Sequence, residues 1–139
     1  MIYEHITQLI GNTPLLKIDP KVHGLINIDL YAKLELFNPF GSVKDRTSLN
    51  MLKDDAEEIK KQGKTVIEAS SGNTAKALAS LASVYGIPFT TVSNRIKVPE
   101  VKQILQVLGA DLVELPGLAE CPDPTDPNNP VSVIEQMKT

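Results

Sequence analysis

Apolar residues recur at helix or strand spacing through the middle of the chain, from residue 42 to residue 115. Between Asp45 and Gln62 they repeat every three or four positions, which predicts one amphipathic helix that ends at Gly63. The short β-branched run at 64–69 predicts a strand. The same alternation then continues, with helices predicted over 74–86 and 99–109 and strands over 87–93 and 110–117.

Strands that alternate with helices pair in parallel through right-handed crossovers. The predicted fold class is therefore α/β, an open parallel sheet with helices on both faces. Upstream, residues 25–36 place Leu30, Ala32, Leu34 and Leu36 on one face and predict a further strand. Beyond residue 115 the chain is rich in proline, which predicts a linker, and a short helix follows it. Three regions result: N-terminal strands over 1–37, a small α/β domain over 38–115, and a linker with a short helix over 116–139.

Composition narrows the class of protein. The chain has 139 residues, 42% of them hydrophobic and 22% charged, as expected of a soluble globular domain. Its net charge of −3, with both signs interspersed, does not favour a nucleic-acid partner. No run approaches the ~18 apolar residues of a membrane span, and the first residues do not resemble a signal peptide, so we expect a cytoplasmic protein without a membrane partner. With one cysteine, Cys121, and two histidines, we predict no disulfide and no metal site.

Lys44 stands in an unusual place for a cation. Ser42 and Asp45 form the S-x-x-D pattern of a capping box, which puts Lys44 in the first turn of a helix. Unpaired N–H groups and the helix dipole make that end partly positive, which disfavours an ammonium group. Two interpretations remain open: the side chain extends into solvent at a small cost, or the lysine is a nucleophile that forms a Schiff base with a carbonyl compound.

A second candidate site follows the predicted strand 64–69. Ligands of open α/β sheets bind at the carboxyl ends of the strands, and the loop there supplies hydroxyls, an amide and a glycine. Its residues are Ser70, Ser71, Gly72, Asn73 and Thr74. Gly72 permits close backbone approach or a positive φ, and the helix start suits a carboxylate or phosphate. The alternative is an ordinary helix start with Asn73 or Thr74 as N-cap. A loop that binds a carboxylate near the amine of Lys44 would suit a protein that binds an amino acid as an imine.

Four segments, QLIGNTPLLKI, AKLELFNPFGSVKDR, EASSGNTAKALA and LGADLVEL, occur in this order. The chain thereby resembles the N-terminal half of cysteine synthases and cystathionine β-synthases, which are fold-type II pyridoxal-phosphate enzymes. The resemblance implies that Lys44 holds pyridoxal 5′-phosphate covalently and that Asn73 binds the cofactor's 3′-oxygen. It also implies that Ser70, Ser71, Gly72 and Thr74, with Asn73 in the same loop, bind the substrate carboxylate.

The implied activity is β-replacement on an O-activated serine, as in the conversion of O-acetylserine and sulfide to cysteine. The freed amine of Lys44 removes the α-proton of this small amino-acid substrate, and the family pattern implies a homodimer. Three departures leave the substrate open: Ser70 where the family usually has threonine, Ala75 where it has glycine, and residues 92–100 where it has a Met-Pro segment. A serine or threonine deaminase-type lyase is an alternative.

One part of a pyridoxal-phosphate site is missing from the sequence. No two of its eight glycines are closer than eight residues, so none forms a glycine-rich phosphate cradle. In the family this cradle lies in the C-terminal half, and we expect the 139-residue chain alone to be inactive. The strands near 15–18 and 30–35 would there pair with the large domain and be left here as exposed edges. The other hypothesis is a non-catalytic, truncated module that binds a small carboxylate.

Overall fold

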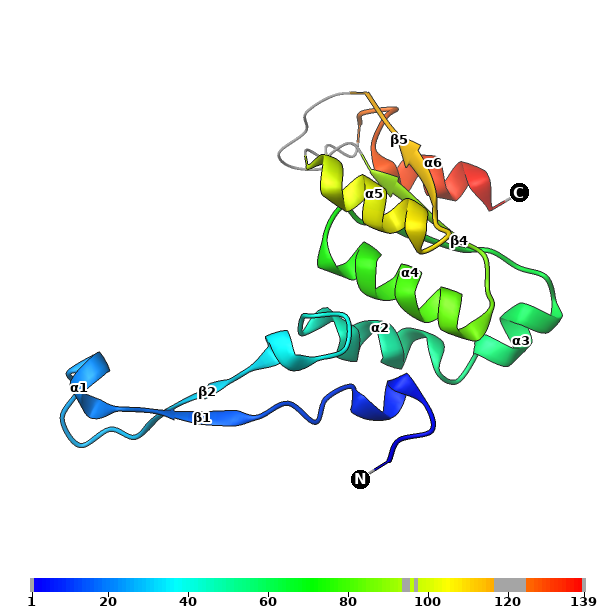
Figure 1. Ribbon diagram of the computed structural model, residues 1–139. Coiled ribbons are helices and arrows are strands. Elements are labelled where there is room, and N and C mark those ends of the chain that lie inside the picture. Colours follow the sequence, from blue (N-terminus) through cyan, green and yellow to red (C-terminus); the bar gives the residue numbers. More distant parts are fainter. Residues whose placement is uncertain (1, 94–95, 97, 117–124, 139) are drawn as a thin grey trace.

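The computed structural model describes residues 2–93, 96, 98–116 and 125–138. Its body is a three-stranded parallel sheet in the order β3-β4-β5, formed by Val66–Ala69, Phe89–Ser93 and Asp111–Glu114. Two crossover helices, α4 (Asn73–Tyr85) and α5 (Pro99–Val107), cover one face, and α6 (Pro130–Met137) packs against β3 and β4 from the other (Figure 1). The predicted fold class is confirmed.

Helix α4 is the centre of the hydrophobic core. Its Leu78 and Leu81 are fully buried, and alanines fill most of its other buried positions. Small side chains let neighbouring elements approach closely, and α2 (Lys44–Leu52) packs along α4 (Figure 1). Leu105 of α5 and Phe89 of β4 complete the core from the sheet side. The helix that carries Lys44 is therefore fixed against the helix that follows the 70–74 loop.

The single helix predicted over 45–62 is wrong, because the chain forms two helices there. Helix α2 ends at Leu52, and α3 (Ala56–Lys61) begins after a turn. That turn contains Asp54 and Asp55, and aspartate is a residue type that favours turns and helix ends over helix interiors. Leu52 and Ala56 on its two sides are both buried.

The strand predicted over 25–36 is also too long. Only β2 (Leu30–Lys33) is extended, and Glu35–Phe37 forms a short 3-10 helix. The Asn38 side-chain amide donates hydrogen bonds to the Glu35 carbonyl at 2.9 Å and to the Glu35 carboxylate at 2.8 Å. These contacts favour the tight turn over a continued strand.

The N-terminal strands form an arm that projects from the body (Figure 1). After a 3-10 turn at Ile6–Leu9, β1 (Leu15–Ile18) pairs antiparallel with β2, in the register Leu15 to Lys33. Helix α1 (Pro20–His23) lies at the far end. The arm exposes many apolar side chains, namely Leu15, Leu16, Val22, Leu25, Ile26, Ile28, Leu30 and Tyr31. These two strands pair with each other, and the expectation that they pair with a larger sheet stays a prediction.

Candidate functional site

The turn before α2 is held by a chain of hydrogen bonds. The Lys44 N–H donates to the Ser42 hydroxyl at 3.1 Å, and that hydroxyl donates to the Asp45 carboxylate at 3.4 Å. The carboxylate also accepts the Phe40 N–H at 2.6 Å, and Asp45 is fully buried. The predicted capping box is therefore wrong in detail, because the Ser42 hydroxyl accepts the N–H of Lys44 rather than that of Asp45, and the Asp45 carboxylate accepts the N–H of Phe40 rather than that of Ser42.

Lys44 is the first residue of α2, as predicted for the first turn. The residue is exposed, and within the described part of the chain its side chain makes neither an ion pair nor a hydrogen bond. An amine in this state is free to react with a ligand that reaches the N-terminus of α2.

The 70–74 loop is anchored by Ser70. Its hydroxyl accepts the Ala75 N–H at 3.1 Å, and its carbonyl accepts the Thr91 hydroxyl of β4 at 2.6 Å. The alternative interpretation with Asn73 or Thr74 as N-cap is wrong, since α4 begins at Asn73 after Gly72 as N-cap residue, and it is the Ser70 hydroxyl that accepts an N–H of the first turn. Ser70 stands two residues before Gly72 and accepts the third N–H of the helix, that of Ala75, as a capping side chain would.

The first N–H groups of α4 are left open for a ligand. In the described ranges, the N–H groups of Asn73 and Thr74 have no hydrogen-bond acceptor. Gly72 has φ −136°, so a positive φ is not its role, and a Cβ there would meet nothing within 4 Å. This open, partly positive helix start can accept a carboxylate or phosphate oxygen.

The structure places the two helix starts at the same end of the body. Helices α2 and α4 run side by side (Figure 1), and the turn before Lys44 lies against the first turn of α4. The contact is made by Lys76, whose Nζ stands 3.6 Å from the point where a Cβ on Gly41 would lie. Gly41 has φ +88°, a conformation that favours glycine. The Lys44 helix start and the loop helix start are thus neighbours, while the reach of the Lys44 amine to the loop stays a prediction.

Sequence reasoning missed a polar clasp between the N-terminal segment and α2. Arg46 donates two hydrogen bonds of 2.8 Å to the Glu35 carboxylate and one of 2.9 Å to the Gly11 carbonyl. Glu35 also accepts the Asn38 amide at 2.8 Å and the Thr13 hydroxyl at 3.2 Å. The partners are up to 35 residues apart, so only the opposite charges of Glu35 and Arg46 around the helix-start motif could have suggested the pair.

This clasp changes the acidity of its carboxylate. The hydrogen bonds from Arg46 are the main cause that lowers the pKa of Glu35 from 4.5 to about 2, against a smaller raising effect of burial. The same hydrogen bonds raise the pKa of Arg46. The pair therefore stays ionised and fixes the N-terminus of α2, on which Lys44 stands.

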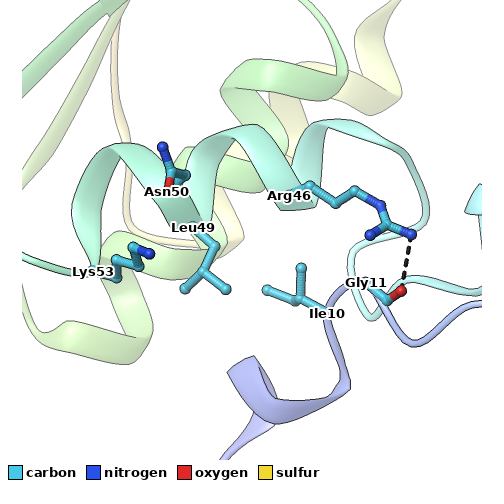
Figure 2. Close-up of a pocket in the computed structure, with 6 residues that line it drawn as sticks. All are labelled: Ile10, Gly11, Arg46, Leu49, Asn50 and Lys53. Carbon is cyan, nitrogen blue, oxygen red and sulfur yellow. Dashed lines mark hydrogen bonds between the residues drawn. The ribbon is translucent and has the colours of Figure 1, made fainter.

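A hollow of about 180 Å³ lies beside the clasp, and Figure 2 draws the residues that line it. Its lining residues are Ile10, Gly11, Arg46, Leu49, Asn50 and Lys53. Arg46, Leu49 and Asn50 of α2, with Lys53 just after its end, form a stripe at helical spacing. It is distinct from the buried stripe of the same helix, which consists of Asp45, Ser48 and Leu52. None of the predicted site residues lines this hollow, so it is separate from the candidate site.

The described residues contain neither a candidate membrane span nor a candidate metal cluster. No helix there has the length and hydrophobicity that crossing a bilayer needs. Histidine, cysteine and acidic side chains in those ranges do not gather in groups of three that could bind a metal ion. Cys121, for which we predicted no disulfide, lies outside the described residues.

The fold and the site define an α/β domain with an exposed lysine at the start of α2 and an open first turn on the neighbouring helix α4. The chain matches the family of pyridoxal-phosphate dependent enzymes over residues 6–137 and belongs to that family.

Comparison with individual proteins points to a smaller group within this family. It is 41% identical over 112 residues to a cysteine synthase of Aquifex aeolicus, covering 78% of this chain and 34% of the relative. It is 40% identical over 116 residues to an O-acetylserine dependent cystathionine β-synthase of Bacillus subtilis, covering 80% and 36%. An O-acetylserine sulfhydrylase of Entamoeba histolytica superposes with a TM-score of 0.81 at 30% identity, over 99% of this chain and 40% of that structure. The chain thus spans about a third of these curated relatives and corresponds to their N-terminal part.

Proposed function

We propose that this chain is the lysine-bearing part of an enzyme that carries out β-replacement on an O-activated serine, in the manner of a cysteine synthase. The observation that carries the proposal is the position of Lys44, exposed at the start of α2, just after a turn that Lys76 of α4 approaches. The named activities of the relatives support the same reaction type, with O-acetylserine as the first substrate to test.

The residues present fit one end of pyridoxal phosphate. The Lys44 amine is available for its aldehyde, and Asn73 is exposed at the start of α4, where its amide can meet the ring oxygen. The phosphate end has no glycine-rich turn in this sequence, because the glycines stand singly. We therefore propose that the phosphate is held by residues outside this chain, in a C-terminal half or in a partner subunit of a homodimer.

Each group of the site has a defined task in the proposed reaction. When bound, the cofactor withdraws electrons from the substrate Cα, which makes the α-proton removable. The N–H groups of Asn73 and Thr74 and the hydroxyls of Ser71 and Thr74 bind the substrate carboxylate. The Lys44 amine takes the α-proton, and it returns the proton to Cα after sulfide has replaced the β-substituent.

Thr91 and Ser70 act by positioning the loop. Their 2.6 Å hydrogen bond fixes the loop to β4, and Ser70 also caps α4. Polar groups that are already held in place need not rearrange during the reaction. The proposed location is the cytoplasm, which a chain with one cysteine suits.

The test is covalent trapping on the 139-residue chain. Pyridoxal phosphate is added, the imine is reduced with borohydride, and the labelled lysine is found by peptide mass mapping. We expect Lys44 to be labelled in preference to Lys53, the residue just after the end of α2, and the Lys44→Ala variant to lose that label while Lys53→Ala keeps it. Labelling spread over the surface lysines, equal to that of the urea-unfolded chain, would contradict a cofactor lysine at this position.

The second candidate function is a non-catalytic module that binds a small carboxylate through the 70–74 loop. The absence of a glycine-rich turn from the sequence favours it. Binding of L-serine at the loop without selective labelling of Lys44 would support this module. In a longer protein that contains the phosphate site, sulfide consumption with O-acetylserine would indicate a synthase, whereas ketoacid release from serine would indicate a deaminase.

A further inference from the structure

The hollow beside the clasp is built from two segments that are far apart in the sequence. Ile10 and Gly11 come from the N-terminal segment, and the other lining residues come from α2 and the position just after it. In Figure 2 the side chains of Ile10 and Leu49 point toward each other. Arg46 lies on one side of them and Lys53 on the other. The hollow therefore exists only while the N-terminal segment lies on α2.

The walls of the hollow are partly apolar and firmly held. Ile10 and Leu49 are partly buried and pack against the hydrophobic core. The volume of the hollow is about 180 Å³, and a cavity of about 150 Å³ is large enough for benzene. Apolar walls with a few polar groups are the usual composition of a small-molecule site. A compact apolar group of about six carbons therefore fits between these two side chains.

Arg46 has one nitrogen left for a ligand. Its Nε and Nη2 donate all of the hydrogen bonds that this side chain makes in the clasp, whereas Nη1 has no acceptor in the described part of the chain. Gly11 lines the hollow and leaves this nitrogen uncovered, because a Cβ on Gly11 would stand 2.8 Å from Nη1. A guanidinium nitrogen with free N–H groups is a strong donor to a carboxylate oxygen.

The other polar groups of the hollow also favour an anion. Asn50 and Lys53 are exposed, and among the described residues their side chains have neither a hydrogen-bond partner nor an ion-pair partner. No acidic residue belongs to the described lining. The carboxylate of the clasp, Glu35, already accepts two hydrogen bonds from Arg46. A carboxylate at Nη1 thus meets three donor groups and no unpaired acid.

We propose that the hollow binds a small carboxylate with a compact apolar body, and that the bound ligand holds the N-terminal segment on α2. The carboxylate accepts from Nη1 of Arg46, and the apolar body fills the space between Ile10 and Leu49. Because both segments supply the walls, the ligand binds only the docked arrangement and stabilises it. This inference goes beyond the proposed function and does not depend on it, since no predicted site residue lines the hollow.

The first experiment measures binding to the 139-residue chain by the NMR shifts of the Gly11 amide and the Arg46 Nε–H group, at about 0.15 M salt to screen non-specific attraction. The probes are benzoate, benzamide, which has nearly the same shape without the charge, and acetate, which has the charge without the ring. We expect benzoate to bind about five-fold more tightly than either of the others, because the ion pair and the buried ring both contribute.

Three variants test where benzoate binds. Asn50→Asp puts a negative charge into the hollow and should abolish the preference for benzoate over benzamide. Thr47→Asp is the matched control, because it puts the same charge on an exposed position of α2 that does not line the hollow, and it should keep most of the preference. Lys53→Met removes a cation from the lining and should weaken benzoate binding about two-fold while benzamide binding stays unchanged.

The second experiment tests whether the ligand holds the N-terminal segment. The Gly11 N–H donates to the Asn38 side chain at 2.8 Å, so it is protected while the segment is docked. Benzoate at ten times its dissociation constant should slow the exchange of this amide hydrogen with solvent about ten-fold. The Lys21 N–H donates to Asp19 at 2.8 Å at the far end of the arm, and its exchange rate should stay the same.

Three outcomes would overturn the inference: equal affinity for the three probes, a benzoate preference that survives Asn50→Asp, or unchanged exchange of the Gly11 amide when benzoate is bound. The proposed function is judged separately by the trapping of Lys44, so either proposal can fail while the other stands.

Discussion

Glu35 and Arg46 hold the N-terminal segment on α2 through charge as well as hydrogen bonds. Glu35 has an ordinary pKa of 4.5 and a pKa of about 2 in the folded chain. A carboxyl whose folded pKa is depressed contributes stability that is fully present above its unfolded pKa and is lost as the pH falls through the folded pKa. The contribution of this pair should therefore disappear between pH 4.5 and about pH 2.

The first prediction concerns Glu35→Gln. At pH 7 we expect this variant to unfold at a lower urea concentration than the parent chain, because Arg46 loses its charged partner. As the pH falls to about 2 the two chains should converge, since the parent's Glu35 then becomes protonated as well. Urea titrations across this pH range measure the effect, with the exposed Glu57→Gln as control. A difference that does not shrink on acidification would refute the role of the charge.

The second prediction concerns Gly11, whose carbonyl accepts a hydrogen bond from the same arginine. It has φ +89°, and an added Cβ would stand 2.8 Å from Nη1 of Arg46. Gly63 has φ +63° and open space around its Cβ position, so it carries the same backbone strain without the clash. Gly63→Ala should cost about 1 kcal/mol of unfolding free energy, and Gly11→Ala should cost more because it also displaces Arg46. Equal losses of unfolding free energy in the two variants, measured by urea unfolding, would show that the Arg46 side chain moves aside without cost.

At the scale of elements, the packing of α5 on the core gives the third prediction. Leu105 is 0% exposed and Val107, two residues later on the same helix, is 87% exposed. Leu105→Ala should lower the free energy of unfolding by about 2–5 kcal/mol, because it leaves a cavity. Val107→Ala should change it by less than about 0.5 kcal/mol. Similar losses in the two variants would mean that α5 is not packed as described.

The elements that sequence patterns predicted well are those whose signal is local. The β-branched run of β3, the alanine-rich stripe of α4 and the proline at the start of α5 each carry their own evidence within a few residues. The break between α2 and α3 and the 3-10 turn at Glu35–Phe37 were missed. The turn is favoured by hydrogen bonds from Asn38 and also by contacts of Glu35 to Arg46 and Thr13, which lie too far away in sequence for a local pattern to contain.

The candidate site shows the same division. Sequence motifs and resemblance pointed to Lys44 and to the 70–74 loop, and the structure sets their two helix starts side by side. The cap made by Ser70 and the approach of Lys76 to Gly41 could not be predicted, because both depend on how the loop turns and how two helices pack.

For the whole molecule, the distribution of exposed apolar side chains separates the arm from the body. Ile26 is 83% exposed and lies among other exposed apolar residues, including Val22, Leu25 and Ile28. Contiguous apolar surface of this kind binds hydrophobic dyes and partner surfaces, whereas scattered single residues do not.

The fourth prediction uses that contrast. Ile26→Ser should lower the fluorescence of the dye anilinonaphthalene sulfonate bound to the chain, while Val107→Ser, which changes an equally exposed residue on the body, should have little effect. The melting temperature should stay the same in both variants. Equal dye binding in the two variants would indicate that the arm is covered in solution.

The order of strands in the sheet also bears on how the chain folds. Because β3, β4 and β5 lie in the sheet in the order in which they occur along the chain, each new helix and strand can pack on the one made just before it. A growing polypeptide could therefore complete this sheet stepwise during synthesis. The arm is synthesised earlier, but the residues that connect it to the body, Gly11 and Glu35, gain their hydrogen bonds only once Arg46 has been made. We therefore expect the amide hydrogens of the arm to exchange with solvent long before those of β4.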